Sequence, residues 1–498
     1  MSSVPEIRIL TLRDDAIRND RDYVLYWMTA FRRGHYNFSL ERAVAWAKKL
    51  NKPLVIFEAL RCGYRWASDR LHRFIIEGMA DNAAHFETKP VSYYPYLEPT
   101  PGAGKGLLKA LADDACVVVS DDFPSFFLPR MMQRAAEQID CRLELVDSNG
   151  LLPMRAADKI FLRAYDFRRF LQKNLLPHLA ECPARDPLAR MQLPRLQSLP
   201  SHITKRWPQA DPGKLLRAPD GLQAFPIDHQ VATVSTHGGA AAAGQALSEF
   251  LNHRLPRYAT DRNQPQQEVA SGLSPYLHFG HISAHEIFAK VTGQEQWTPD
   301  RTAAKATGSS SGWWGVSEAA ESFLDELITW REVGYNMCWQ CENYDQYESL
   351  PEWTRKTLEQ HESDPRPHCY TLAQFESAGT HDELWNAAQR QLVRQGRIHN
   401  YLRMLWGKKI LEWSATSRDA LATMIELNNK YALDGRNPNS YSGIFWVLGR
   451  YDRPWAPERP IFGTIRYMSS QNTARKVRVK QYLEEFAASD GQQRLAFE

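Results

Sequence analysis

The sequence has no long apolar run, few cysteines and almost no net charge. It contains no continuous apolar stretch of the about 20 residues that a transmembrane helix needs, so we expect no contact with a membrane. Seven cysteines at irregular spacing among 498 residues do not form a disulfide framework, which indicates a reducing, cytoplasmic setting. A net charge of +3 is too small to indicate that the chain as a whole binds nucleic acid.

Glycine-rich phosphate loops and metal-ligand clusters are also missing. Neither GxGxxG nor GxxxxGK follows any predicted strand, so a nicotinamide-dinucleotide site and a P-loop both lack their glycines. Cys338 and Cys341 form a CxxC, with Cys369 further on. Because a zinc or iron–sulfur site would need four ligands at tighter spacing, we predict no metal site.

The first 150 residues alternate short apolar runs with segments of helical spacing. We predict strands at 23–28, 53–60, 91–97, 116–122 and 142–147 and helices at 39–50, 67–86, 104–114 and 124–139. Strands that are apolar on both sides and alternate with helices predict a doubly wound parallel sheet, that is, an α/β domain. Residues 1–20 are polar and read as a loose lead-in.

From Gly238 onward the strand patterns disappear. We predict helices at 246–255, 282–291, 319–339, 351–361, 384–396, 397–413 and 418–433. The length predicts two or three domains. We therefore divide the chain into an α/β domain at 1–165, a linker at 166–237 and an all-α domain at 238–498. Within the last, the Ser/Gly-rich stretch 307–315 predicts a surface loop in which Trp313 and Trp314 are partly exposed.

Tryptophan is abundant, with 15 residues, and two lie in the helix predicted at 397–413. At 3.6 residues per turn, one face of this helix carries Asn400, Arg403, Trp406, Ile410 and Trp413. An amide, a guanidinium and two indoles about 10.5 Å apart along the axis are suited to a redox ring that gains charge on reduction. The alternative is a buried helix whose tryptophans fill volume.

Two further segments suggest a ligand site. Glu326 and Trp330 are four residues apart on the predicted helix 319–339 and share a face, which suits a stacked ligand with one hydrogen-bonding partner. Residues 258–280 form a Ser/Gly-rich loop leading into a helix, and such a helix start can cradle a phosphate. The alternatives are a partly exposed Glu beside a packing Trp, and an ordinary Ser N-cap followed by Pro.

Near the C-terminal end, residues 450–480 carry eight Arg or Lys against Asp452 and Glu458, a local charge of +6, interleaved with aromatic residues. A basic surface that bears aromatic rings suits contact with a nucleic-acid backbone. The alternative is an ordinary solvated face. The preceding stretch 434–446, DGRNPNSYSGIFW, predicts a structured turn with side chains directed inward.

Eight strings of this sequence, taken together, resemble the photolyase/cryptochrome flavoproteins, and specifically the class II cyclobutane pyrimidine dimer (CPD) photolyases. They are VLYWM, NKPLVIF, SGLSPYLHFG, ESFLDELITWRE, LWNAAQ, HNYLRMLWGKKILEW, LDGRNPN and ERPIFGTIRYM. They occur in the family's order over roughly residues 20 to 485.

The resemblance implies one non-covalent FAD in the helical domain. It assigns phosphate-side contacts to Tyr258, Ser271, Leu273 and Ser274 and further cofactor contacts to Arg331, Arg397, Asn400 and Arg403. Asp434 matches a carboxylate that pairs with Arg403, and Asn428 matches the class II asparagine near flavin N5. The position that holds this asparagine in class I enzymes is Ser440 here.

The same resemblance implies which residues contact the lesion and which carry electrons to the cofactor. Glu326 matches the glutamate that hydrogen-bonds the dimer, Trp330 and Trp446 the indoles that clasp it, and Met404 the thioether beneath it. The chain that photoreduces FAD is matched by Trp385, Trp406 and Trp413. The implied partner is double-stranded DNA containing a pyrimidine dimer, and we expect a monomer.

The alternative function is a cryptochrome-like photoreceptor without repair activity. Gln264 and Asn437 stand where Asp is common in the family, and the segment 446–455 is one residue shorter than usual, which keeps this alternative open. The sequence carries no diagnostic residue for a second, light-harvesting chromophore, although a cleft of the α/β domain could hold one.

Overall fold

A computed structural model describes residues 4–488, which form two compact units. The first comprises residues 4–158, 173–249 and 272–300, and the second 159–172, 250–271 and 301–488. Neither unit is continuous in sequence, unlike the three stretches predicted above. Most of the predicted linker, residues 173–237, makes its contacts within the first unit.

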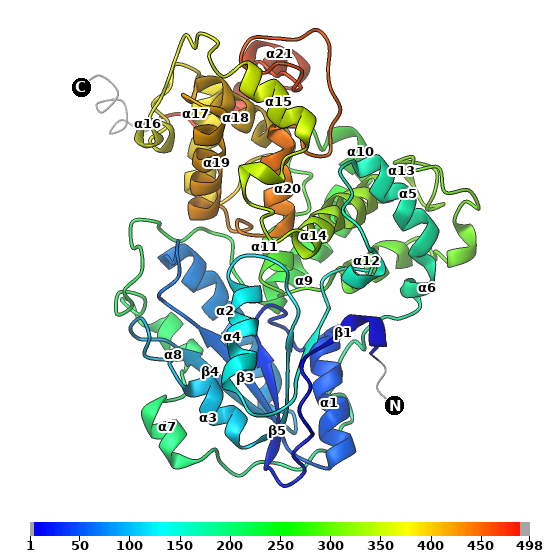
Figure 1. Ribbon diagram of the computed structural model, residues 1–498, viewed down its shortest axis with the longest axis vertical. Helices are drawn as coiled ribbons and strands as arrows, with labels where there is room; N and C mark the ends of the chain where they lie inside the picture. The colour runs from blue at the N-terminus through cyan, green and yellow to red at the C-terminus, as the bar shows by residue number, and fades with distance from the viewer. Residues whose placement is uncertain (1–3, 489–498) are drawn as a thin grey trace. The chain divides into compact units, whose positions relative to one another are not determined.

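The first unit contains a six-stranded sheet in the order β1-β6-β5-β2-β3-β4. Several of its strands are labelled in Figure 1. The strands are β1 (Ile9–Arg13), β2 (Tyr23–Met28), β3 (Leu54–Leu60), β4 (Ser92–Leu97), β5 (Ala115–Asp121) and β6 (Leu143–Val146). All neighbouring pairs are parallel except β1 with β6, which is antiparallel. The predicted α/β fold is confirmed. The prediction of a loose lead-in at 1–20 was wrong, because residues 9–13 form β1, a strand at one edge of the sheet.

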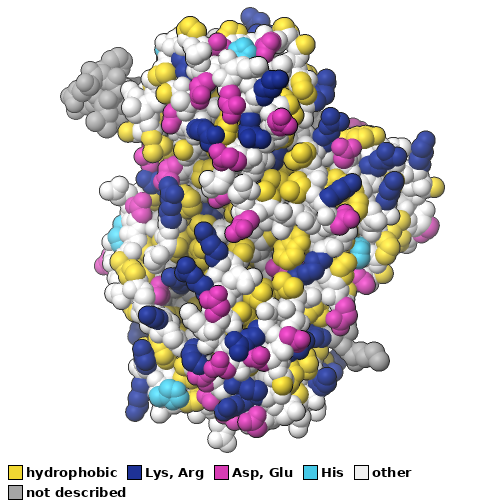
Figure 2. Space-filling view, in the orientation of Figure 1, with side chains coloured by type: hydrophobic (Ala, Val, Ile, Leu, Met, Phe, Trp, Pro, Cys, Tyr) yellow, Lys and Arg dark blue, Asp and Glu magenta, His cyan; other side chains and the backbone are white. Residues whose placement is uncertain are grey.

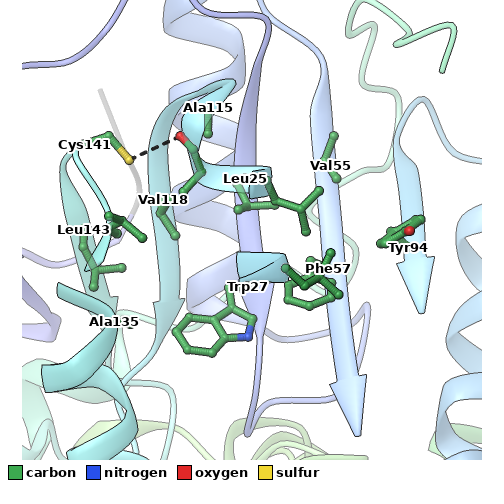
Figure 3. Close-up of a cluster of buried hydrophobic side chains, with 14 of the residues drawn as sticks. Leu25, Trp27, Val55, Phe57, Tyr94, Ala115, Val118, Ala135, Cys141 and Leu143 are labelled. Atoms are coloured by element: carbon green, nitrogen blue, oxygen red, sulfur yellow. Dashed lines mark hydrogen bonds between the residues drawn. The ribbon is translucent and has the colours of Figure 1, made fainter. Parts of the chain in front are cut away.

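Side chains of the central strand β2 alternate between two apolar cores, as a doubly wound sheet requires. Leu25 and Trp27 point into one core, shown in Figure 3, which includes residues of α3 (Leu107–Asp113), α4 (Leu128–Gln138) and α7 (Ser201–Arg206). Val24 and Tyr26 point into the other, with α1 (Phe38–Leu50). Both faces of the sheet are therefore covered.

The remaining elements of this unit are mostly short. They are η1 (Glu6–Arg8), α2 (Asp69–Glu87), η2 (Met154–Ala156), α6 (Leu176–Leu179), α8 (Pro212–Arg217), α9 (Ala240–Glu249), α11 (Ser274–His278) and α12 (Ala284–Gly293), while α5 (Ala164–Asn174) and η5 (Pro299–Arg301) cross the unit boundaries.

The second unit is helical, as predicted. Its elements are η3 (Phe250–Arg254), η4 (Leu255–Arg257), α10 (Tyr258–Asp261), α13 (Glu318–Leu324), η6 (Asp325–Trp330), α14 (Arg331–Gln340), η7 (Tyr347–Ser349), α15 (Glu352–Gln360), α16 (Leu372–Glu376), α17 (Glu383–Gln395), α18 (Asn400–Trp413), α19 (Ser417–Tyr431), α20 (Pro438–Val447), α21 (Ser470–Lys476) and α22 (Lys480–Glu485). The helix predicted at 319–339 is interrupted by η6, a π-helical turn, and such turns are frequent at functional sites. No helix among residues 4–488 is both long and apolar enough to span a membrane.

The predicted exposure of Trp313 and Trp314 was wrong, because only 4% and 7% of their surfaces are accessible. The carboxylate of Glu321, near the start of α13, accepts hydrogen bonds from the backbone N–H groups of Gly312, Trp313 and Trp314 at 2.6, 2.8 and 3.0 Å. This carboxylate folds the loop back onto the helix and buries both indoles.

Local signals set both ends of α17 and the start of α18. The Asp382 carboxylate caps α17 by accepting a hydrogen bond from the Trp385 N–H at 3.0 Å. Gly396 ends the helix with a φ of 69°, which glycine adopts without a steric penalty. The Gln391 side chain then accepts the His399 N–H at 2.9 Å, immediately before α18 begins.

Gly407 sets the spacing between α18 and α20. A Cβ at this position would lie 2.5 Å from Cγ2 of Val447 and 3.1 Å from the sulfur of Met424. We expect Gly407→Ala to lower the free energy of unfolding by about 1–3 kcal/mol through overpacking. Thermal unfolding measures this, with Gly443→Ala on α20 as control, because its Cβ would meet no atom within 4 Å. Equal stability of the two variants would contradict the prediction.

Candidate active site

Glu326 lies in η6 and is held by Arg262, whose Nη1 donates to its Oε1 at 2.5 Å. The Glu326 side chain keeps 29% of its surface accessible. Burial raises the pKa of Glu326, and the Arg262 guanidinium partly opposes this. The Arg262 guanidinium also lies 5.8 Å from the ring centre of Tyr258, on α10, so three residues predicted or found at this site come together.

Trp330 ends η6, and α14 continues directly from it to pack against α20. A Cβ on Gly334 would lie 2.6 Å from Oγ of Ser442 and 2.7 Å from the carbonyl oxygen of Pro438, so these helices approach closely. The indoles of Trp330 and Trp446 are both half-buried. The helices that carry them therefore belong to one tightly packed pair.

Arg331 provides a direct test of whether this unit suits an anionic cofactor. Its side chain is buried, and Nη2 donates to the hydroxyl of Tyr335 at 3.0 Å. Its Nη1 is also buried and has no hydrogen-bond partner among the described residues. A buried, permanently charged donor of this kind is costly unless an acceptor is bound, so the site fits a phosphate-bearing group such as FAD.

The turn 434–437 and the helices beside it hold one predicted pair and one contact that was not predicted. Arg403 Nη2 lies 3.5 Å from Asp434 Oδ2, as the resemblance implied, and Asp434 is 7% exposed. Buried Asn428 donates through Nδ2 to the Ser440 hydroxyl at 2.7 Å. The two positions at which class II and class I enzymes place their asparagine are thus in direct contact.

The three tryptophans predicted to carry electrons lie together and are at most 3% exposed. Trp385 Nε1 donates to the backbone carbonyl of Trp406 at 3.0 Å, and its ring centre lies 6.0 Å from that of Trp413. Trp406 Nε1 donates to Gln389 on α17 at 2.9 Å. The stripe predicted on α18 therefore closes into a compact cluster through α17.

The other predicted residues of the second unit are exposed or half-buried. Arg397 pairs with Glu268 at 2.9 Å, with 40% and 65% of the side-chain surfaces exposed. Asn400, the first residue of α18, is exposed, whereas Met404 and Ser271 are half-buried.

Leu273 and Ser274 fall in the first unit. Leu273 is the N-cap of α11 and Ser274 its first residue, and no side chain caps this helix, so the alternative of an ordinary serine N-cap does not hold.

The basic segment 450–480 is only partly available for binding. Arg450 is 1% exposed and donates to the Tyr344 carbonyl, so it belongs to the core rather than to the predicted basic surface. Arg466 lies 5.6 Å from the ring centre of Trp446 and 5.0 Å from that of Trp455. On the face drawn in Figure 2, basic and acidic side chains are interspersed, consistent with the low net charge.

Known proteins similar to this chain all point to one family. The sequence is 35% identical to a deoxyribodipyrimidine photo-lyase of Methanothermobacter thermautotrophicus over 93% of this chain and 94% of that protein. It is 30% identical to one of Potorous tridactylus, over 97% of this chain and 85% of that protein, and 32% identical to one of Arabidopsis thaliana, over 92% and 88%. The chain belongs to the deoxyribodipyrimidine photo-lyase family.

Solved structures of the photolyase/cryptochrome family support the fold. A class III photolyase from Agrobacterium tumefaciens superimposes with a TM-score of 0.68 at 15% identity, covering 97% of this chain and 93% of that one. A Synechocystis cryptochrome gives 0.65 at 14%, covering 96% and 94%. No known family profile matches the sequence. The family generally binds FAD, in keeping with Arg331.

Several residues that contact the predicted site residues escaped the sequence analysis. Arg262 contacts Glu326, and Gln389 contacts Trp406, at separations of 64 and 17 residues. Ser440 was named only as the class I position, and its contact with Asn428, 12 residues away, was not expected. Tyr370 and His381 lie 5.7 and 4.9 Å from the Trp413 ring, and the Tyr370 hydroxyl is 2.6 Å from His381 Nδ1. For Arg262, the available signal in the sequence was its spacing of four residues from Tyr258, which places both side chains on one face of a helix.

We expect Arg262→Gln to raise the pKa of Glu326 further, because the cation that opposes the effect of burial is lost. Infrared difference spectroscopy of the Glu326 carboxyl, assigned with Glu326→Gln, measures this shift. Arg257→Gln is the control, since Arg257 pairs with Asp261 at 2.9 Å on the exposed side of the same segment. A pKa of Glu326 that falls on loss of Arg262 would contradict the assignment of this pair.

Proposed function

We propose that this photolyase repairs cyclobutane pyrimidine dimers in DNA in a light-dependent reaction and that it is of class II. The observation that supports this most directly is the buried cluster of Trp385, Trp406 and Trp413 on α17 and α18, because α18 also carries Arg403, which pairs with Asp434. A cluster that merely filled volume would not need this ion pair, or the buried Arg331 Nη1 without an acceptor in residues 4–488, in the same helical unit.

Reduced FAD, when bound, would supply an electron to the lesion on excitation by blue or near-ultraviolet light and would recover it once the two carbon–carbon bonds of the cyclobutane ring have opened. Arg331 would bind its phosphates through the donor that lacks a partner. The Arg403–Asp434 pair would place a fixed dipole at the flavin, and Asn428, oriented by Ser440, would offer an amide at its edge. Tyr258 and Ser271 would complete the site from the segment 258–271, and Arg397 and Asn400 from the residues at and just before the start of α18.

The lesion is reached by extrusion, because base stacking hides the bonds that must break, and a dimer that already weakens pairing lowers the cost. Trp330 and Trp446 would replace the lost stacking, and Met404 would contact the extruded bases. The Glu326 carboxyl would donate a hydrogen bond to the carbonyl on which negative charge develops. The exposed arginines of 453–478 would hold the phosphates without regard to sequence.

The test is repair of an oligonucleotide that contains one thymine dimer, under anaerobic illumination near 400 nm. The loss of the dimer is the measured quantity. Repair supports the proposal. A flavin that photoreduces normally while the dimer persists would favour the cryptochrome-like photoreceptor, whose fold is shared. A parallel assay with a six-four photoproduct decides the lesion. The monomeric state, the cytoplasmic location and a second, light-harvesting chromophore stay predictions.

A further inference from the structure

Lys408 is a fully buried lysine of α18 that none of the roles above uses. It lies on the helix that carries Arg403, Trp406 and Trp413, but its side chain reaches α20. There, Nζ donates to the carbonyl oxygen of Val447, the last residue of the helix. The same Nζ lies 5.5 Å from the ring centre of Trp446.

The end of α20 depends on this lysine. The carbonyls of the last turn of a helix lack intrahelical donors. Here the Phe445 carbonyl accepts the Arg450 N–H at 3.0 Å and the Trp446 carbonyl accepts the Gly449 N–H at 2.9 Å. The Val447 carbonyl, in contrast, accepts the Lys408 ammonium. The residue next to Trp446 is thereby tied to α18, at a point where Gly407 already brings the two helices close.

Trp446 has a second cationic neighbour in Arg466, at 5.6 Å from its ring centre. Arg466 comes from an exposed segment, whereas Lys408 comes from the core. Helix α20 carries no charged side chain of its own. Burial lowers the pKa of Lys408 to about 7, and the charges acting on it are Asp452, which opposes the shift, and Arg466, which adds to it.

Burying an ammonium group costs solvation free energy that an apolar residue would avoid. A lysine at the buried position 408 therefore calls for a compensating role. A cation close to an indole is attracted by its π-system and restrains the ring. We propose that Lys408 is a positioning residue that fixes the indole of Trp446 for stacking on an extruded lesion. This rests on the proposed function, since it takes Trp446 to be a lesion contact.

A double-mutant cycle tests the proposal with the flavin-loaded protein. The ratio of dissociation constants for undamaged and thymine-dimer oligonucleotides is measured for Lys408→Met, Trp446→Phe and the double variant. We expect Lys408→Met to lower this ratio by about tenfold and the double variant to be no worse than Trp446→Phe, because the lysine acts through the indole. Lys408→Arg, which keeps the charge and the donors, should restore most of the ratio.

Lys430→Met is the control for a lost lysine, since Lys430 pairs with Glu376 at 2.6 Å and has no contact with Trp446 among those described. The inference would be overturned, and the proposed function left intact, if Trp446→Phe lowered the ratio of dissociation constants and Lys408→Met left it unchanged. It would also be overturned if the effects of the two substitutions were additive in the double variant. If Trp446→Phe changes nothing, the proposed lesion contact falls, and the inference with it.

Tryptophan fluorescence of the DNA-free protein gives a readout that a purely structural lysine would not move. The wild-type emission should contain a component that titrates near pH 7 and that both Lys408→Met and Trp446→Phe remove. Should Lys408→Met fail to fold, the comparison of wild type with Trp446→Phe still decides. The absence of a Trp446-dependent component near pH 7 would overturn the inference.

Discussion

Replacing Glu326 with alanine should lower the light-driven repair rate about 100-fold and weaken binding of dimer-containing DNA far less. A preorganised donor aimed at developing charge is worth most in the transition state, and removing one costs about this factor. Because burial raises the pKa of Glu326, its carboxyl holds a proton to higher pH than a solvated glutamate does. The measurement is single-turnover repair beside a binding titration.

The pH dependence of repair follows from the same carboxyl. A step that needs the protonated acid is supported below the pKa of Glu326 and is lost as pH rises through it. Glu326→Gln, which keeps a donor but no titrating proton, should therefore retain part of the rate and lose this pH dependence. Glu318→Ala, at an exposed position of α13, is the matched control. Equal losses of binding and repair in Glu326→Ala would make this residue structural.

Much of the fold followed from local patterns. Strands apolar on both faces predicted the parallel sheet, and in β2 the two faces bury Trp27 and Tyr26 in separate cores. The strand Ile9–Arg13 was missed because its partner, Leu143–Val146, lies about 130 residues away and its own residues are only half-buried. Pairing at this separation leaves no periodic signal in the edge strand itself.

The candidate site was likewise predictable only in part. Helical spacing placed Trp406 and Trp413 on one face, but spacing alone could not show that Trp385 lies between them. The resemblance supplied the Arg403–Asp434 pair, which the structure shows at 3.5 Å. Arg450 illustrates the limit, because charge counting treats every arginine as exposed, whereas this one packs 3.7 Å from the Phe445 ring centre and donates into the core.

Replacing Trp385 with phenylalanine should slow photoreduction of oxidised FAD by at least about tenfold, equivalent to about 1.4 kcal/mol in the barrier. Trp385 contacts both other members of the cluster, through its hydrogen bond to the Trp406 carbonyl and its ring contact with Trp413. Phenylalanine is harder to oxidise and lacks the N–H donor. Repair by chemically reduced enzyme should persist, because the electron that reaches the lesion does not pass through this residue.

The side chain of Trp385 is completely buried, so the substitution also leaves a cavity that could cost about 1–3 kcal/mol of stability. Phe375→Leu reproduces that damage, since Phe375 is 1% exposed and lies 5.3 Å from the Trp385 ring without belonging to the electron-transfer cluster. Slow photoreduction in Trp385→Phe and Trp413→Phe, with a normal rate in Phe375→Leu, would separate electron transfer from packing. Normal photoreduction in Trp385→Phe would contradict the prediction. It would mean that Trp385 does not pass electrons between Trp406 and Trp413 and that the cluster is part of the apolar core.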